Sequence, residues 1–130
     1  MLVQALGLLA GSAFVFLVGA TREISTLVLA MTLFGFCKGF YDSNIFASLY
    51  DFVEPRVRAT AAGVMNTVGW GGGALAPLLF GWVAKHGRHE SEVENMSEAI
   101  SFGGVIYLLG ALLLFAGIYL QRRSRGEKER

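Results

Sequence analysis

The chain has 130 residues, of which 54% are apolar and only 16% are charged. Soluble domains carry roughly 25% charged residues, so the composition excludes an ordinary water-soluble protein. The formal net charge is +1, a balance that argues against a nucleic-acid partner. The charged residues gather in short runs between long apolar stretches, which is typical of a chain that crosses a membrane several times.

The first predicted span covers residues 2–20, which contain no charged residue. A helix of this length measures about 28 Å at roughly 1.5 Å per residue, enough to cross the hydrocarbon of a bilayer. A cleaved signal peptide is the alternative interpretation. Because no basic segment precedes the apolar run, which is also longer than the hydrophobic region of such a peptide, we favour a transmembrane helix.

The second predicted span covers residues 27–50 and differs from the first in carrying charge. Lys38 and Asp42 lie near its middle, in an otherwise apolar setting. The hydrophilic segment at 51–58 ends this span, because Pro55 disfavours helical conformation at the residue before it and lacks an N–H donor.

The third predicted span covers residues 59–84, which are free of charge and rich in glycine. Because Pro77 lies inside it, close to three consecutive glycines at 71–73, we expect a kink or a locally opened backbone there. The fourth predicted span covers residues 100–120, and Ser97 is its expected N-cap.

These segments predict an all-α fold, a polytopic membrane bundle of four transmembrane helices. Most Lys and Arg residues fall on one side of the predicted bundle, the side of the 51–58 loop and of the charged tail at 121–130. The positive-inside rule therefore places that loop and the tail in the cytoplasm. The seven residues on this side are Arg56, Arg58, Arg122, Arg123, Arg125, Lys128 and Arg130, and the three on the other are Arg22, Lys85 and Arg88.

Pairs of glycines four residues apart place two small residues on one face of three predicted helices. In a membrane, such faces allow the backbones of two helices to approach closely. We therefore interpret three pairs as helix packing surfaces: Gly7 with Gly11, Gly35 with Gly39, and Gly69 with Gly73.

The polar residues of the second span are arranged on one face, because Lys38, Tyr41 and Asp42 are three and four positions apart. A single charge at that depth costs about 2.5 to 3.5 kcal/mol on insertion scales. Two interpretations stay open: an ion pair that only permits insertion, and a substrate-binding or coupling site. Two apolar residues would permit insertion more simply, so we favour the functional interpretation.

Other polar side chains are expected to join this site. Asn44 lies on an adjacent flank of the second span, Asn66 lies in the third span near the cytoplasmic side, and Trp70 follows one turn deeper. The first and fourth spans are plainer, and we expect them at the periphery of the bundle. The polar groups noted in their interiors are Ser12, Ser101 and Tyr107.

The stretches Gly39 to Asp51 and Pro55 to Gly63 are similar to the tenth helix, cytoplasmic loop and eleventh helix of major facilitator superfamily transporters. Asp51, Arg58 and Gly63 match the family's loop signature: an acidic residue, an arginine seven positions later and a glycine five further on. Pro55 stands one position later than in that signature. The resemblance implies that Asp51, Arg58 and Gly63 belong to a cytoplasmic loop or gate.

The resemblance covers nearly the whole chain and matches its spans to helices nine to twelve of a twelve-helix fold. It implies secondary active transport by alternating access between two six-helix halves, with a proton or sodium as coupling ion and no cofactor. Among subgroups, the chain most resembles carriers of organic anions and sugar acids. The resemblance also implies a location in the plasma membrane, the inner membrane of the cell, and a chain that needs the missing transporter helices.

A small self-assembling four-helix transporter, or a membrane subunit of a larger complex, is the alternative function. An enzyme is disfavoured, because His86, His89 and Glu90 lie in a hydrophilic segment without a convincing further metal ligand. A phosphate-binding motif is missing too, which argues against ATP-driven transport. Cys37, the single cysteine, lies in an apolar run and is predicted to be a buried small hydrophobe.

Overall fold

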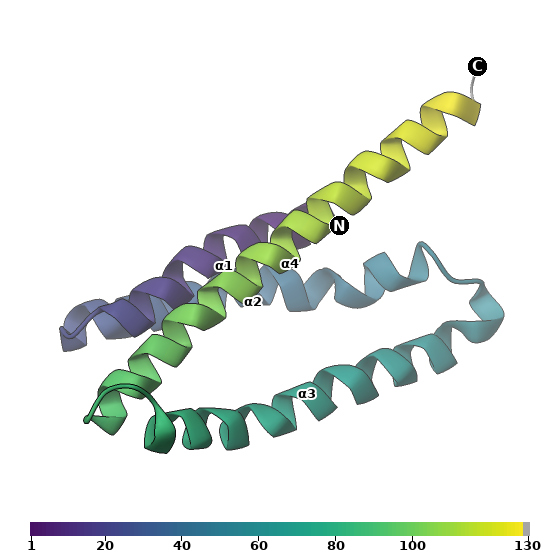
Figure 1. Cartoon of the computed structure of the whole chain (residues 1–130). Helices are drawn as coiled ribbons and strands as arrows, with labels where there is room; N and C mark the ends of the chain where they lie inside the picture. The colour runs from purple at the N-terminus through teal and green to yellow at the C-terminus, as the bar shows by residue number, and fades with distance from the viewer. Residues whose placement is uncertain (129–130) are drawn as a thin grey trace.

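The computed structural model describes residues 1–128, with side chains described through Arg123 (Figure 1). Within this part of the chain no strand is present, and four helices are each long and apolar enough to span a membrane. The predicted all-α fold is therefore confirmed. The elements are α1 (Leu2–Ala20), α2 (Ile24–Tyr50), the 3-10 helix η1 (Pro55–Val57), α3 (Arg58–His86) and α4 (Glu92–Lys128).

α3 stays helical along its whole length, although glycines 71–73 and Pro77 lie inside it. A proline in a helix removes one N–H donor and crowds the preceding turn, which bends the helix without necessarily breaking it. Figure 1 shows α3 as a bowed helix. The locally opened backbone expected at this place is therefore absent from α3.

α1 is the best-buried helix of the bundle and packs against both α4 and α2, so the peripheral place expected for it is wrong in the described bundle. Glycines make these two contacts close. A Cβ on Gly7 would lie 2.8 Å from the carbonyl oxygen of Cys37 on α2, and one on Gly19 would lie 2.5 Å from the backbone nitrogen of Ser101 on α4. Gly11 also faces Cys37, so the packing role predicted for Gly7 and Gly11 is confirmed.

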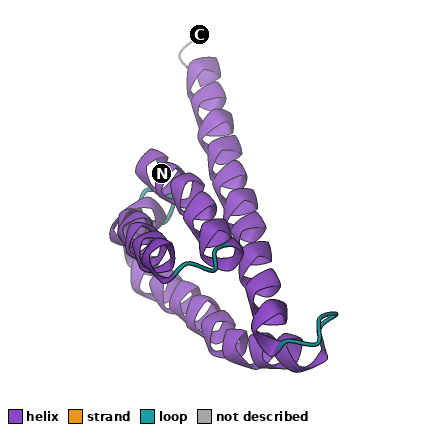
Figure 2. Ribbon diagram, turned by 90° about the vertical axis from the view of Figure 1, so that its left-hand side faces the viewer, coloured by secondary structure: helices purple, strands orange, loops and turns teal. Residues whose placement is uncertain are grey.

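α2 and α3 diverge from the loop that joins them and contact each other little (Figure 1, Figure 2). Gly35 and Gly39 of α2, and Gly69 and Gly73 of α3, have no atom within 4 Å of the position that a Cβ would take. The packing role predicted for these two pairs is not met inside the described bundle. Long faces of α2 and α3 are consequently uncovered, and Trp70 on α3 is 78% exposed.

α4 begins at Glu92, inside the hydrophilic segment, so the expected N-cap at Ser97 is wrong. Glu92 and Glu94 lie in the first turn, where negative charge interacts favourably with the helix dipole. The Glu94 N–H donates to the Ser91 carbonyl over 3.1 Å. Ser97 lies within the helix instead, and its hydroxyl accepts a hydrogen bond from Arg22 Nη1 over 3.2 Å.

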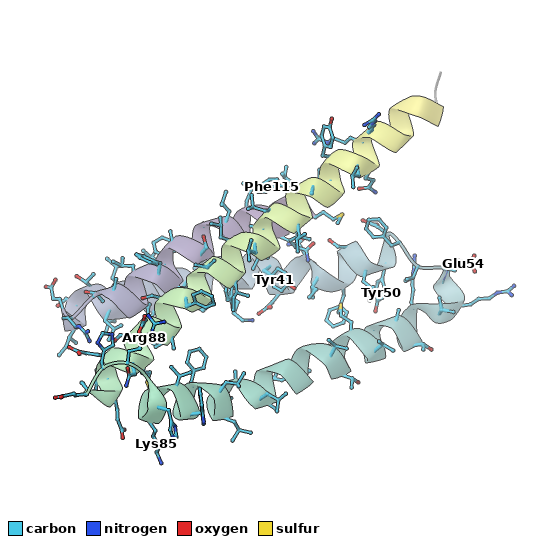
Figure 3. The ribbon with its side chains drawn as sticks, viewed as in Figure 1. Tyr41, Tyr50, Glu54, Lys85, Arg88 and Phe115 are labelled. Atoms are coloured by element: carbon cyan, nitrogen blue, oxygen red, sulfur yellow. The ribbon has the colours of Figure 1, made fainter. Side chains whose placement is uncertain are left out.

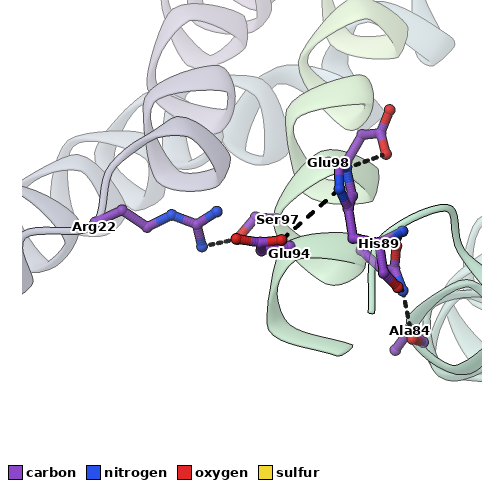
Figure 4. Close-up of polar contacts among 7 residues, drawn as sticks. Arg22, Ala84, His89, Glu94, Ser97 and Glu98 are labelled. Carbon is purple, nitrogen blue, oxygen red and sulfur yellow. Dashed lines mark hydrogen bonds and ion pairs between the residues drawn. The ribbon is translucent and has the colours of Figure 1, made fainter. Parts of the chain in front are cut away.

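The turn between α3 and α4 is held together by the side chain of Asn95, which is only 2% exposed. Its Nδ2 donates to the carbonyls of Ala84 over 3.0 Å and His89 over 2.9 Å, and its Oδ1 accepts from the His89 N–H over 2.8 Å. Figure 3 shows Lys85 and Arg88 at this end of the bundle, and Figure 4 shows the polar contacts of the turn. A single buried amide therefore satisfies three backbone groups of the turn.

Candidate functional site

The ion pair predicted on α2 is present in the structure. Lys38 Nζ donates a hydrogen bond to Asp42 Oδ2 over 2.5 Å, one helical turn further along α2. The two side chains are 45% and 54% exposed, so the other described helices do not enclose the pair. A paired charge at the middle of a span, with one side uncovered, is suited to receiving a further charged group.

Two other predicted residues of α2 differ in their relation to this pair. Tyr41 is half-buried on the same face of α2, near the middle of the helix (Figure 3). Asn44 instead donates from Nδ2 to the Phe40 carbonyl over 3.0 Å and to Ser43 Oγ over 3.1 Å. Its amide hydrogens are therefore used within α2 itself, whereas Tyr41 shares the face of the pair.

The predicted residues of α3, Asn66 and Trp70, are both exposed in the structure. They lie on a helix that contacts α2 little. The described bundle therefore does not bring them together with Lys38. A solute site that included both helices would have to span the uncovered space between them.

The residues that match the family's loop signature lie where α2 ends and α3 begins. Arg58 Nη2 donates to the carbonyl oxygen of Tyr50 over 3.1 Å, and the guanidinium carbon lies 5.3 Å from the centroid of the Tyr50 ring. A cation at the C-terminus of a helix interacts favourably with the helix dipole. Arg58 thus binds a backbone carbonyl in the last turn of α2. Asp51 is the exposed C-cap residue of α2, and Gly63 faces open space.

One buried polar contact was missed by the sequence reasoning. Ser48 Oγ of α2 donates to Gln4 Oε1 of α1, and the two residues are 9% and 3% exposed. The sequence contains one indication of this contact, which is a glutamine inside an uncharged and mainly apolar run. The contact ties α1 to α2 by a hydrogen bond, which helps two transmembrane helices associate.

Tyr107 of α4 is the second residue that the sequence reasoning undervalued. Its ring meets the ring of Phe34 on α2 edge to face, with the centroids 5.3 Å apart and the planes inclined by 73°. α4 is therefore not a plain peripheral helix, because Tyr107 contacts α2 one turn before Lys38.

Two cavities between the helices are apolar and lie away from the ion pair. One of about 490 Å³ lies between α3 and α4 and is lined by side chains such as Leu79 and Phe102, with Glu98 at its edge. Another of about 280 Å³ lies between α1 and α4, next to Phe16 and Gly104. Apart from Glu98 in the first and Ser12 in the second, both are lined by apolar residues, which does not suit a hydrophilic solute.

In the α3–α4 turn, two carboxylates lie near the ring of His89. Its Nδ1 is 3.8 Å from a Glu94 oxygen and its Nε2 is 3.4 Å from a Glu98 oxygen (Figure 4). Because the two carboxylates face different ring nitrogens, they do not converge on one metal position. Within the described residues no three His, Cys, Asp or Glu side chains are placed to hold a metal ion, and Cys37 is buried, as predicted.

A comparison with protein families decides the class of this membrane protein. The model described as Major Facilitator Superfamily matches residues 1–130. The chain belongs to the major facilitator superfamily. Comparisons with curated proteins and with solved structures gave no match. Family membership, together with four membrane-spanning helices, makes this major facilitator chain an integral membrane protein of solute transport.

Proposed function

We propose that this major facilitator chain is part of a secondary active transporter that moves a small organic anion, such as a sugar acid. The observation that carries the proposal is the uncovered Lys38–Asp42 pair at the middle of α2. Lys38 is the single basic residue inside the four predicted spans. Lys38 is therefore the cation that the spans of this chain offer to a solute carboxylate.

The same pair provides a means of coupling. When a solute carboxylate takes the Lys38 ammonium, the Asp42 carboxylate loses its partner in a setting that disfavours an unpaired charge. A proton or a sodium ion then restores neutrality at Asp42. Movement of the anion is thereby tied to movement of a cation, and alternating access carries both across the membrane.

The open faces of α2 and α3 support a transport path that is completed by further helices. Both helices present glycine pairs with nothing packed against them. They also contact each other little, so further helices would have to enclose a solute between them. We propose that the chain supplies helices nine to twelve, the C-terminal part of a twelve-helix transporter. In the alternative, a self-assembling four-helix transporter, copies of the same chain would cover these faces.

Solute uptake tests this proposal. Vesicles that contain the intact transporter should accumulate radiolabelled gluconate or glucuronate. They should not accumulate sorbitol, because this neutral sugar alcohol lacks the carboxylate that Lys38 would bind. Vesicles with the 130-residue chain alone should contain inserted helices but show no saturable uptake. Uptake of sorbitol in preference to the acids would contradict an anion site, and saturable uptake by the chain alone would favour the self-assembling alternative.

The orientation proposed from the charges is open to a separate test. We propose that the α2–α3 loop and the C-terminus are cytoplasmic and that the protein resides in the plasma membrane. In a Cys37→Ala background, a membrane-impermeant maleimide added from outside should label Glu92→Cys and spare Arg56→Cys. The parent background without a new cysteine is the control. Labelling of Arg56→Cys alone would reverse the assignment.

A further inference from the structure

Glycines on α1 allow side chains of α4 to reach the candidate site on α2. Gly11 of α1 lies beside the Phe34 ring of α2, so that a Cβ there would be 3.6 Å from the ring. The Tyr107 ring of α4 meets the same Phe34 ring. Because α1 contacts both neighbours through glycine, aromatic side chains of α2 and α4 touch although the two helices themselves are separated.

The register of α4 explains why this residue in particular is involved. Gly104 and Ala111, which lie three and four positions from Tyr107, are on the face of α4 that packs against α1. Gly104 would place a Cβ 3.0 Å from the carbonyl oxygen of Ser12, and Ala111 is fully buried. Tyr107 is thus a large side chain between small ones, and it extends past α1 toward α2.

The contact with Phe34 places Tyr107 close to the ion pair. Phe34, Lys38, Tyr41 and Asp42 follow one another at intervals that keep them on the same side of α2. Tyr107 therefore meets α2 one turn before Lys38 and two turns before Asp42. Tyr107 lies near the middle of the Glu92–Arg123 membrane segment, at a depth similar to that of the pair.

We propose that Tyr107 is a positioning residue of the Lys38–Asp42 site, whose hydroxyl donates to the Asp42 carboxylate when an anionic solute occupies Lys38. This inference rests on the proposed function. In the structure Lys38 and Asp42 bind each other, so the tyrosine hydroxyl becomes important when the pair opens. The edge contact with Phe34 holds the ring in place, and a neutral donor stabilises the freed carboxylate without adding a charge to the membrane interior.

The chain permits a test that needs no solute, because its aspartates are Asp42 and Asp51 only. Carboxyl-labelled [13C]aspartate in an Asp51→Asn chain therefore reports on Asp42 alone by infrared spectroscopy in lipid vesicles. In a Lys38→Met background, Tyr107→Phe should shift the Asp42 carboxyl band, because it removes the hydroxyl and keeps the ring. Tyr119→Phe is the matched control, since Tyr119 is 66% exposed on the same helix. Superimposable Asp42 bands with and without Tyr107→Phe would overturn the inference.

A second measurement keeps Lys38 and so avoids a chain that inserts poorly. The difference spectrum between the intact transporter and its Tyr107→Phe variant isolates the phenol C–O band of Tyr107. Saturating gluconate should shift this band, because it opens the pair and frees Asp42 to accept from the hydroxyl, and sorbitol should not. A Tyr107 band that gluconate leaves unshifted, in a transporter that takes up gluconate, would contradict the inference even if the first experiment failed for lack of insertion.

Uptake separates this inference from the proposed function. In the intact transporter, Tyr107→Phe should raise the KM for gluconate about ten-fold, the effect of losing one hydrogen bond to a charged group. A role in packing alone would leave KM unchanged, because phenylalanine keeps the contact with Phe34. If Lys38→Met abolishes uptake and Tyr107→Phe changes neither KM nor the infrared bands, the inference fails and the proposed function stands. Shifted bands with uptake that is indifferent to Lys38→Met would place Tyr107 at the pair and overturn its role in transport.

Discussion

Lys38→Met should lower the uptake of gluconate by the intact transporter by about 100-fold, because removal of one partner from a desolvated charge pair costs about 2 to 5 kcal/mol. The variant removes the fixed cation of the proposed site and leaves Asp42 unpaired at the middle of α2. Asp42→Leu should impair uptake for the complementary reason, since it leaves the ammonium without its partner. Initial rates at several pH values measure both effects, and Glu90→Gln, at an exposed carboxylate outside the spans, is the control.

The double variant Lys38→Met with Asp42→Leu decides between the two interpretations of the pair. If the charges serve only to neutralise each other, the double variant inserts and transports normally, whereas each single variant is impaired. A site for an anion and a coupling ion predicts normal insertion without uptake. Normal uptake with an unaltered pH dependence in the double variant would remove Lys38 from the mechanism.

Gly19→Ala should destabilise the chain by about 1 to 3 kcal/mol, the usual cost of forcing an extra methyl group into a closely packed site. The new Cβ would lie 2.5 Å from the backbone nitrogen of Ser101 and the carbonyl oxygen of Ser97. Backbone atoms of a helix cannot rotate away as a side chain does, so α1 and α4 would have to separate. The glycine φ angles are not positive in the described chain, so backbone conformation itself does not oppose alanine.

Gly35→Ala is the matched control, because it makes the same chemical change at a helical glycine with nothing within 4 Å. We expect this variant to be at least as stable as the parent chain, by up to about 1 kcal/mol, because alanine favours a helix over glycine. Unfolding by denaturing detergent in mixed micelles, followed by circular dichroism, measures both variants. Equal effects at Gly19 and Gly35 would mean that the close contact between α1 and α4 does not hold the bundle together.

Because faces of α2 and α3 are uncovered, we expect one substitution to affect the stability of the chain alone and of the intact transporter differently. A glycine such as Gly35 is open in the described bundle, yet it has the spacing of a helix packing surface. If further helices cover α2 as proposed, Gly35→Ala should be tolerated in the chain alone and should lower the stability of the intact transporter. This comparison requires the same unfolding measurement on the intact transporter and its Gly35→Ala variant.

Features that depend on neighbouring residues along the chain were predictable from the amino-acid sequence. Apolar runs of sufficient length predicted the membrane-spanning helices, because a backbone in lipid must satisfy its hydrogen bonds within the segment. The Lys38–Asp42 pair was predictable for the same local reason, since side chains four positions apart meet on one helix face. The loop signature at Asp51, Arg58 and Gly63 indicated the superfamily that the comparison of the whole chain then established.

Which of these helices touch, and which side chains meet between them, became known from the folded bundle. Gly7 with Gly11, and Gly35 with Gly39, have the same spacing, but only the first pair is covered by a neighbouring helix. Tyr107 had no local feature to separate it from a plain apolar span, and its place beside Phe34 follows from the way α4 crosses α1. Contacts between helices depend on the match of two surfaces distant in the sequence, which the pattern of either helix alone does not contain.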